Sequence, residues 1–256
     1  MTRLLILGGT AEGRLLTERA TVDLGCVVTL SLAGITQTPT LPAGVAVRRC
    51  GFGGVAGLTR WLFETGTEAL ICATHPFALQ MPRHVFAAAG AANLPALRLL
   101  RPEWRPSPRD RWHVYTTLHA AIAGLPPGAH ALLTTGSGMT ELPRRTDLRM
   151  TLRTIEPPPE PISGIGLIVA RPPFSQVAEV TLFRRLGITH LVTRNAGGGD
   201  RARLDAARIL RLPVHMLGRP TPLEVPTVAT VDAALGWLQT LGSKNAGTGP
   251  SPGAVP

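Results

Sequence analysis

Lysine and aromatic residues are scarce in this 256-residue chain. Lys244 is the only lysine, so the formal charge of +10 comes almost wholly from arginine. Aromatic residues make up 4% of the chain and are not interleaved with the basic ones, and no recognised nucleic-acid motif is present. We therefore expect no nucleic-acid partner, and a basic nucleic-acid-binding protein is the least supported alternative. A net positive field of this kind favours a small anionic ligand instead.

Cysteine is also scarce, with Cys26, Cys50 and Cys72 far apart and odd in number. This spacing excludes a disulfide framework and a zinc site, and we expect buried cysteines in strands and no metal. Long apolar runs are absent as well. The apolar run nearest the N-terminus, residues 4–7, is too short for a signal-peptide core or a membrane span. The sequence thus predicts a cytoplasmic protein with no membrane partner.

An apolar run, a glycine turn and a helical pattern open the chain, over residues 4–16. A buried strand that gives way to a helix leaves unpaired backbone N–H groups at the crevice above the sheet, which form a phosphate site. Gly8 and Gly13 match the first and last glycines of the dinucleotide fingerprint, but Thr10 takes the middle place, and a plain strand-to-helix turn is the alternative. The expected cofactor contacts are Gly8, Gly9, Thr10, Glu12, Gly13 and Arg14.

The second expected strand, residues 26–32, ends without an acidic residue. Sites specific for NAD usually place Asp or Glu here to bind the ribose 2′-hydroxyl. The absence of a carboxylate favours a 2′-phosphate and hence NADPH, with Ser31 and Gly34 as contacts and Thr36, Arg48 or Arg49 available nearby. Ser31 could instead merely end the strand.

Apolar runs typical of buried strands alternate with helical patterns along most of the chain, which predicts an α/β protein. We expect two Rossmann-like, doubly wound parallel-sheet domains with a cleft between them. The expected boundaries are an NADPH-binding domain over residues 1–100, a proline-rich linker over 101–111, a second domain on the substrate side over 112–241, and a disordered tail over 242–256.

Three expected strand ends carry Thr, His, Gly, Arg or Asn, and the carboxyl ends of parallel strands face the ligand crevice. Thr74 is an expected cofactor contact, and His75 beside it is either a structural hydrogen-bonding residue or a catalytic one. A fourth strand ends at Arg171; for this residue, as for Arg14 and Arg194, a solvated surface position is the alternative. The expected substrate contacts are His75, Gly136, Ser137, Arg171, Arg194, Asn195, Gly197 and Gly198.

Four segments in order resemble the precorrin-6A reductase family. They are Leu7-Gly8-Gly9-Thr10-Ala11-Glu12-Gly13, Thr74-His75-Pro76-Phe77-Ala78, Arg171-Pro172-Pro173-Phe174-Ser175 and Leu191-Val192-Thr193-Arg194-Asn195-Ala196-Gly197-Gly198. The first is shared with many nucleotide binders, whereas the second and fourth are specific. The resemblance covers most of residues 4–220 and nothing after Gly242.

The resemblance implies reduction of one double bond of precorrin-6A by hydride from NADPH, giving precorrin-6B (dihydroprecorrin-6A) in corrin ring biosynthesis. It also implies a polycarboxylate tetrapyrrole substrate and transient contact with other corrin-pathway enzymes. Arginines suit such a substrate because their planar fork binds carboxylates in pairs of hydrogen bonds. His75 is the best-placed proton donor, with Tyr115 a weaker candidate, and water or the substrate's own acidic groups are equal alternatives.

Short-chain dehydrogenases share the glycine turn but need a Tyr-x-x-x-Lys pair. The single tyrosine, Tyr115, is followed four residues later by His119, so that chemistry is excluded. The remaining alternative to a reductase is a non-catalytic NADPH-binding sensor or regulator, in which the same fold binds the cofactor and controls a partner.

Overall fold

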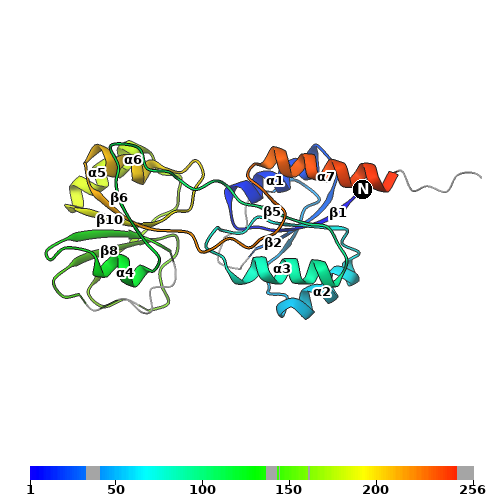
Figure 1. Cartoon of the computed structure of the whole chain (residues 1–256), viewed down its shortest axis with the longest axis horizontal. Helices are drawn as coiled ribbons and strands as arrows, with labels where there is room; N and C mark the ends of the chain where they lie inside the picture. Colours follow the sequence, from blue (N-terminus) through cyan, green and yellow to red (C-terminus); the bar gives the residue numbers. More distant parts are fainter. Residues whose placement is uncertain (33–40, 137–142, 144, 161, 247–256) are drawn as a thin grey trace, which may run out of the picture. The chain divides into compact units, whose positions relative to one another are not determined.

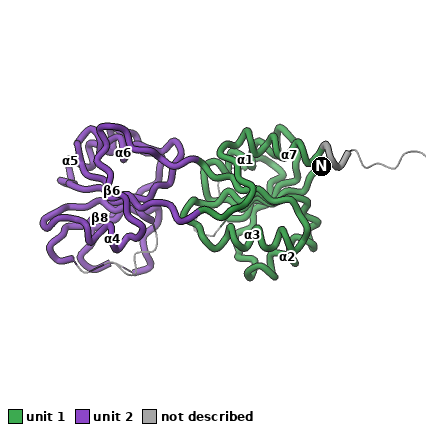
Figure 2. Tube along the Cα trace, viewed as in Figure 1, with its two compact units in different colours: residues 1–101, 222–256 green, residues 102–221 purple. Residues whose placement is uncertain are grey.

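The computed structural model describes residues 1–32, 41–136, 143, 145–160 and 162–246. It divides the chain into two compact units, unit 1 with residues 1–101 and 222–256 and unit 2 with residues 102–221 (Figure 2). Each unit contains a six-stranded sheet in which all pairings are parallel. The prediction of two parallel-sheet α/β domains is therefore confirmed.

The sheet of unit 1 has the strand order β12-β5-β4-β1-β2-β3. Helices α1 and α7 cover one face and α2 and α3 the other (Figure 1). Alternate residues of β1 serve the two layers, since Leu4 and Ile6 pack with α1 and α7 whereas Leu5 and Leu7 pack with α2 and α3. The elements are β1 Arg3–Leu7, α1 Ala11–Val22, β2 Val27–Ser31, β3 Ala46–Arg48, α2 Gly54–Thr65, β4 Ala69–Cys72, α3 Gln80–Ala91, β5 Ala96–Leu99, β12 Thr227–Val228 and α7 Val231–Ala246.

The sheet of unit 2 has the order β6-β11-β10-β7-β8-β9, with α5 and α6 on one face and α4 on the other (Figure 1). Helix α5 begins and ends where its sequence predicts: the Ser175 hydroxyl accepts from the Ala178 N–H at 3.1 Å, and Gly187 ends the helix with a φ of 66°. The elements are β6 Arg111–Tyr115, α4 Leu118–Ala123, β7 His130–Thr134, β8 Arg149–Thr154, β9 Ile165–Val169, α5 Gln176–Leu186, β10 His190–Arg194, α6 Ala202–Ile209 and β11 Pro213–Leu217.

The C-terminal segment differs from the expectation. Residues 222–241 were expected in the second domain, but the structure places them in unit 1. Strand β12 adds to the edge of the first sheet beside β5, and the apolar side of α7 packs into the core around α1. The helix also continues to Ala246, so the expected disordered tail does not begin at residue 242, and residues 247–256 lie outside the described part of the chain.

Two smaller findings bear on the first expectations. Cys26 and Cys72 are buried, but Cys50 is exposed just after β3, so its expected burial was wrong. Across the described ranges, no helix is long and apolar enough to cross a membrane.

Leu238 tests the assignment of α7 to unit 1. Its side chain is 4% exposed in the core around α1. We expect Leu238→Ala to lower the free energy of unfolding by about 3 kcal/mol, because it removes buried apolar surface and leaves a cavity. Urea unfolding would measure the change, with Thr240→Ala on the exposed side of the helix as the control. A loss below about 0.5 kcal/mol, the usual size for surface substitutions, would contradict the packing.

Three histidines of unit 2 titrate below their ordinary range. Burial lowers the pKa of His130, His190 and His215, and nearby positive charge adds to this effect for each. His215 donates from Nδ1 to the Ala121 carbonyl at 2.9 Å; this bond favours the protonated ring, but burial outweighs it and lowers the pKa of His215. The unfolded chain therefore takes up protons at a higher pH than the folded one.

This difference predicts a loss of stability on acidification. As the pH falls through the unfolded histidine pKa of about 6.5, the unfolded state binds protons that the folded state does not, so the free energy of unfolding falls. Urea midpoints between about pH 8 and 5 would measure it. His215→Asn should flatten the slope, whereas His119→Asn, at an exposed position on α4, should not. A midpoint that rises on acidification would contradict the prediction.

Candidate functional site

The turn after β1 is built so that the chain can pass close to β2. Gly8 is buried and its N–H donates to the Ser31 carbonyl at 2.8 Å, and a Cβ at this position would lie 2.7 Å from Leu30 Cδ1. Gly9 has a φ of 123°, which only glycine adopts freely, and nothing lies within 4 Å of its side-chain position. The turn therefore presents bare backbone to open space.

Thr10 joins the start of α1 to the end of β4. Its Oγ1 accepts from the Gly13 N–H at 3.0 Å and donates to the Ala73 carbonyl at 2.9 Å. Gly13 allows this approach, since a Cβ there would be 3.1 Å from Ala73 Cβ. The hydroxyl of Thr10 is thus used within the fold, and the N–H groups of Ala11 and Glu12 belong to the first turn of α1, where a helix supplies no backbone acceptor.

Two charged residues flank this turn. The Glu12 carboxylate accepts from Arg101 Nη1 at 2.8 Å, with side chains only 25% and 18% exposed. This pairing neutralises a carboxylate that would otherwise repel a phosphate at the helix start. Arg14 lies exposed on α1. The expected contacts of residues 8–14 therefore lie together at one helix end, with Glu12 acting through its ion pair.

The end of β2 lies beside that of β3. Ser31 is buried and pairs in register with Arg48. Arg48 donates from Nη2 to the Gly51 carbonyl at 3.0 Å and stacks on Phe52, with Cζ 4.5 Å from the ring centroid. Its buried Nε has no hydrogen-bond partner within the described residues. Gly34, also expected here, lies outside them.

The end of β4 carries Thr74 and His75, both half-buried. Thr74 Oγ1 lies 3.5 Å from Cys72 Sγ. His75 Nδ1 accepts from the Phe77 N–H at 3.2 Å, which requires the ring proton to be on Nε2. In this arrangement His75 is a neutral hydrogen-bond donor. To act as an acid it would have to protonate Nδ1 and lose the bond from Phe77.

In unit 2, the residues after β10 bind a neighbouring stretch of chain. The buried Asn195 accepts from the Trp104 N–H at 2.9 Å and donates to the Trp104 carbonyl at 3.0 Å, while Trp104 Nε1 donates to the Gly198 carbonyl at 2.7 Å. A Cβ at Gly197 would meet the Pro102 carbonyl at 2.0 Å. These three residues were expected to contact substrate, but the structure uses their polar groups and small size to hold residues 102–104.

Arg219, which the sequence did not single out, completes this clamp. Its guanidinium donates to the carbonyls of Asn195 and Ala196 at 3.0 Å and of Pro102 at 3.2 Å, and its side chain is 6% exposed. Its position directly after β11, level with the end of β10, was the only signal that could have identified it.

Arginines gather at the carboxyl edge of the unit 2 sheet. Arg194 at the end of β10 is half-buried, which lowers its pKa, and its Nη1 lies 3.8 Å from the side-chain position of Gly136 after β7. Arg203 in the first turn of α6 donates from Nε to Thr193 Oγ1 at 3.1 Å, and burial lowers its pKa. Arg194 and Gly136 were both expected as substrate contacts, whereas Arg203, which also pairs with Asp200 three residues before it, was not singled out.

A buried ion pair lies near the end of β8, in the same sheet. Arg153 near the end of β8 donates to Glu179 Oε1 at 2.5 Å, and the side chains are 6% and 1% exposed. Arg153 also stacks on Phe174 at 4.3 Å. By contrast, Arg171 pairs with Glu156 at 2.9 Å on the surface, which contributes little energy. Ser137, the remaining expected contact, lies outside the described residues.

The clamp on Trp104 predicts a structural effect of an Asn195 substitution. We expect Asn195→Ala to lower the free energy of unfolding by about 2–3 kcal/mol, because the Trp104 N–H and C=O would be left buried and unpaired. Chemical denaturation would measure this, with Gln80→Ala, an exposed amide at the start of α3 in unit 1, as a control outside the clamp. Unchanged stability combined with weaker substrate binding would contradict the structural role.

The chain is similar to known proteins over nearly its full length. The family model described as Precorrin-6x reductase CbiJ/CobK matches residues 3–239. A Precorrin-6A reductase of Rhodococcus erythropolis is 41% identical over 94% of this chain and 99% of that protein, and one of Rhodobacter capsulatus is 37% identical over 95% and 98%. A solved structure titled CobK precorrin-6A reductase matches with a TM-score of 0.83 at 35% identity, covering 94% of this chain and 98% of the other. The chain therefore belongs to the precorrin-6x reductase (CbiJ/CobK) family.

Proposed function

We propose that this protein reduces one ring double bond of precorrin-6A with hydride from NADPH, giving precorrin-6B in corrin ring biosynthesis. The observation that carries the proposal is membership of the family over residues 3–239, nearly the full chain. The geometry of the strand ends supports it, because each unit presents groups suited to an anion. Action in the cytoplasm and transient contact with other corrin-pathway enzymes complete the proposal.

The turn after β1 fits the phosphates of a nicotinamide cofactor. Gly9 leaves open space above the turn, and the first turn of α1 directs the N–H groups of Ala11 and Glu12 toward it. Thr10 and Gly13 fix the helix start against β4, and Gly8 fixes the turn against β2. When bound, NADPH supplies the hydride. The protein's part is to hold the cofactor and exclude water from the reacting atoms.

The end of β2 favours NADPH over NADH. No carboxylate follows Ser31 in the sequence, and Arg48 pairs with Ser31 in the neighbouring strand. A guanidinium at this place would bind the 2′-phosphate, and its stacking on Phe52 keeps the side chain in position. The buried Nε of Arg48, which has no partner in the described part of the chain, is a donor for that phosphate.

On the substrate side we assign the carboxylate contacts to Arg194 and Arg203 rather than to Asn195. Both guanidiniums are partly removed from water, where an ion pair is stronger than at an exposed surface. Gly136 gives Arg194 the space it occupies. A substrate with acetate and propionate groups would be oriented by these forks.

The proton that completes the reduction comes from water or from the substrate's acidic groups in this proposal. His75 at the end of β4 has its Nδ1 engaged by the Phe77 N–H. It therefore orients a ligand by donating from Nε2 rather than giving up a proton. Replacement by Gln, which keeps a donor, should then preserve most of the activity, whereas a true acid would not be rescued.

The reaction itself is tested by an anaerobic assay with precorrin-6A and NADPH that carries deuterium at the transferable position. We expect NADPH oxidation with deuterium in the reduced ring, measured by absorbance and product mass. Binding of NADPH with an unchanged ring would overturn the proposal for this substrate. Turnover of the cobalt-containing analogue would then reassign the substrate, and inertness toward both would favour a sensor.

The cofactor preference is tested separately with Arg48→Gln. We expect the ratio of kcat/KM for NADPH to that for NADH to fall about tenfold, because one charge-assisted contact to the 2′-phosphate is lost. Arg60→Gln, at an exposed position on α2, removes the same charge from the same unit and should leave the ratio unchanged. An equal loss with both cofactors would assign Arg48 to stability of the β3 edge instead.

A further inference from the structure

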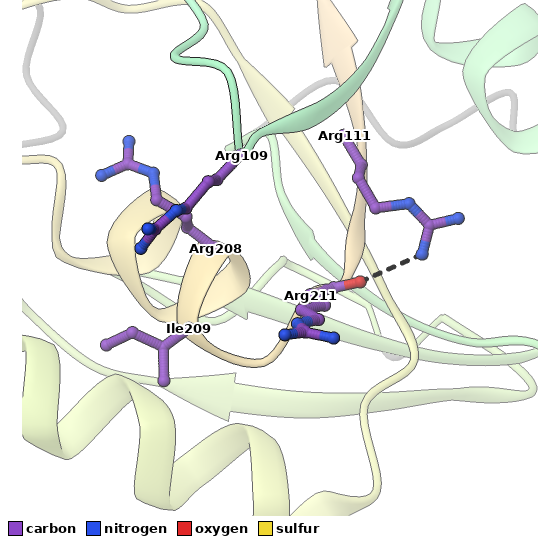
Figure 3. Close-up of a pocket in the computed structure, with 5 residues that line it drawn as sticks. All are labelled: Arg109, Arg111, Arg208, Ile209 and Arg211. Atoms are coloured by element: carbon purple, nitrogen blue, oxygen red, sulfur yellow. Dashed lines mark hydrogen bonds between the residues drawn. The ribbon is translucent and has the colours of Figure 1, made fainter.

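A second arginine-lined cavity lies in unit 2, away from the strand ends discussed above. It has a volume of about 720 Å³ and is lined by Arg109, Arg111, Arg208, Ile209 and Arg211 (Figure 3). These residues come from the loop before β6, the first residue of β6, the end of α6 and the loop that leads into β11. No residue of the proposed reductase site takes part in it.

The cavity lies at the amino edge of the unit 2 sheet. Arg111 begins β6, and Arg211 lies two residues before Pro213, which pairs with Arg111 at the start of β11. Arg194 stands at the opposite, carboxyl end of β10, and five residues of strand at about 3.3 Å each put about 16 Å between the two edges. A ligand in this cavity is therefore not the substrate group that Arg194 would hold.

The charges around the cavity are unbalanced. Arg208 is neutralised, since its Nε and Nη2 bind the two Asp110 oxygens at 2.8 and 3.1 Å and its Nη1 lies 3.1 Å from Asp205. For Arg109, Arg111 and Arg211, no carboxylate lies within ion-pair distance in the described structure. Arg111 donates instead to the Arg211 carbonyl at 3.2 Å (Figure 3). Three arginines without a carboxylate partner in the described structure thus line one cavity.

We propose that this cavity binds a compact small-molecule polyanion, with at least three negative charges carried by a phosphate chain or by a polycarboxylate. The bidentate pairing of Arg208 with Asp110 shows how a planar oxyanion fits a guanidinium at this rim. The volume lies within the usual range for small-ligand pockets, and the half-exposed Ile209 supplies an apolar wall for the rest of the ligand. The inference does not depend on the proposed reductase function.

The test is calorimetric titration of the full chain with inorganic tripolyphosphate and, separately, propane-1,2,3-tricarboxylate. With the cofactor site filled by saturating NADPH, we expect saturable binding of at least one of the two probes at a single site per chain. The double substitution R109Q and R211Q should weaken it by about tenfold or more, because two charge-assisted contacts are lost. The probe that binds more tightly shows whether the natural ligand carries phosphate groups or carboxylate groups.

The matched control is R184Q with R185Q, which removes the same charge from the exposed last turn of α5 in the same unit. It should leave binding within about twofold, and thermal unfolding would show that both double variants are folded. Equal weakening by the control would reduce the effect to the overall positive charge and overturn the site. Failure of both probes to saturate would do the same.

Competition separates this site from the cofactor site. Tripolyphosphate binding should persist in the presence of saturating NADPH, and the R109Q and R211Q variant should oxidise NADPH with precorrin-6A at the unsubstituted rate. Displacement of the probe by NADPH would overturn the proposal, because the cavity would then hold the cofactor. Tighter binding of duplex DNA than of either probe would also overturn it, since an extended polyanion would be the true partner.

Discussion

The close approach of α1 to the carboxyl ends of β2 and β4 is the constraint on which the site in unit 1 depends. Gly8 binds the Ser31 carbonyl, Thr10 binds the Ala73 carbonyl, and Gly13 leaves no room for a side chain against Ala73. A helix held this close brings its unpaired first-turn N–H groups to the edge of the sheet. The apolar residues of β1 pack into the cores on both faces of the sheet, and this packing fixes the position of the turn that follows.

In unit 2 the end of the sheet is organised by contacts with another segment of the same unit. There the loop after β10 is occupied by the chain itself, since Asn195, Gly198 and Arg219 hold residues 102–104. The polar backbone of that segment is satisfied inside the protein, and its Trp104 ring becomes a surface on which Arg203 stacks. The Asn and Gly of this loop therefore serve the fold, and the substrate contacts that we propose, Arg194 and Arg203, come from β10 and α6.

Much of the fold follows from local patterns in the sequence. Continuous apolar runs such as that of β1 and β4 mark central parallel strands, and the Ser175 cap and Gly187 stop mark α5 to the residue. Strand β6 was missed because it is an edge strand whose residues are mostly half-exposed or exposed, so it lacks the apolar run of a central strand. Strand β12 has two residues, which is too short for any periodicity.

Tertiary partners explain the other differences. The apolar stripe of α7 is visible in the sequence, but the stripe does not say which sheet it will cover, and the helix returns to unit 1. Likewise Asn195 after a strand end is as suitable for a ligand as for a backbone clamp, and only the position of Trp104 decides. The turn at residues 8–13 was predictable as a structure because its glycines and the Thr10 cap are neighbours in the sequence.

The preference for arginine over lysine has a structural basis that the net charge conceals. Several arginines bind more than one backbone carbonyl, as Arg219 does at the clamp and Arg145 does with the carbonyls of Ile122, Ala123 and Leu125 after α4. A lysine ammonium lacks the planar fork that makes such contacts. Others, such as Arg153 and Arg208, are neutralised by buried or half-buried carboxylates. Arginine thus binds carbonyls and carboxylates within this fold, a role that the net charge of +10 does not show.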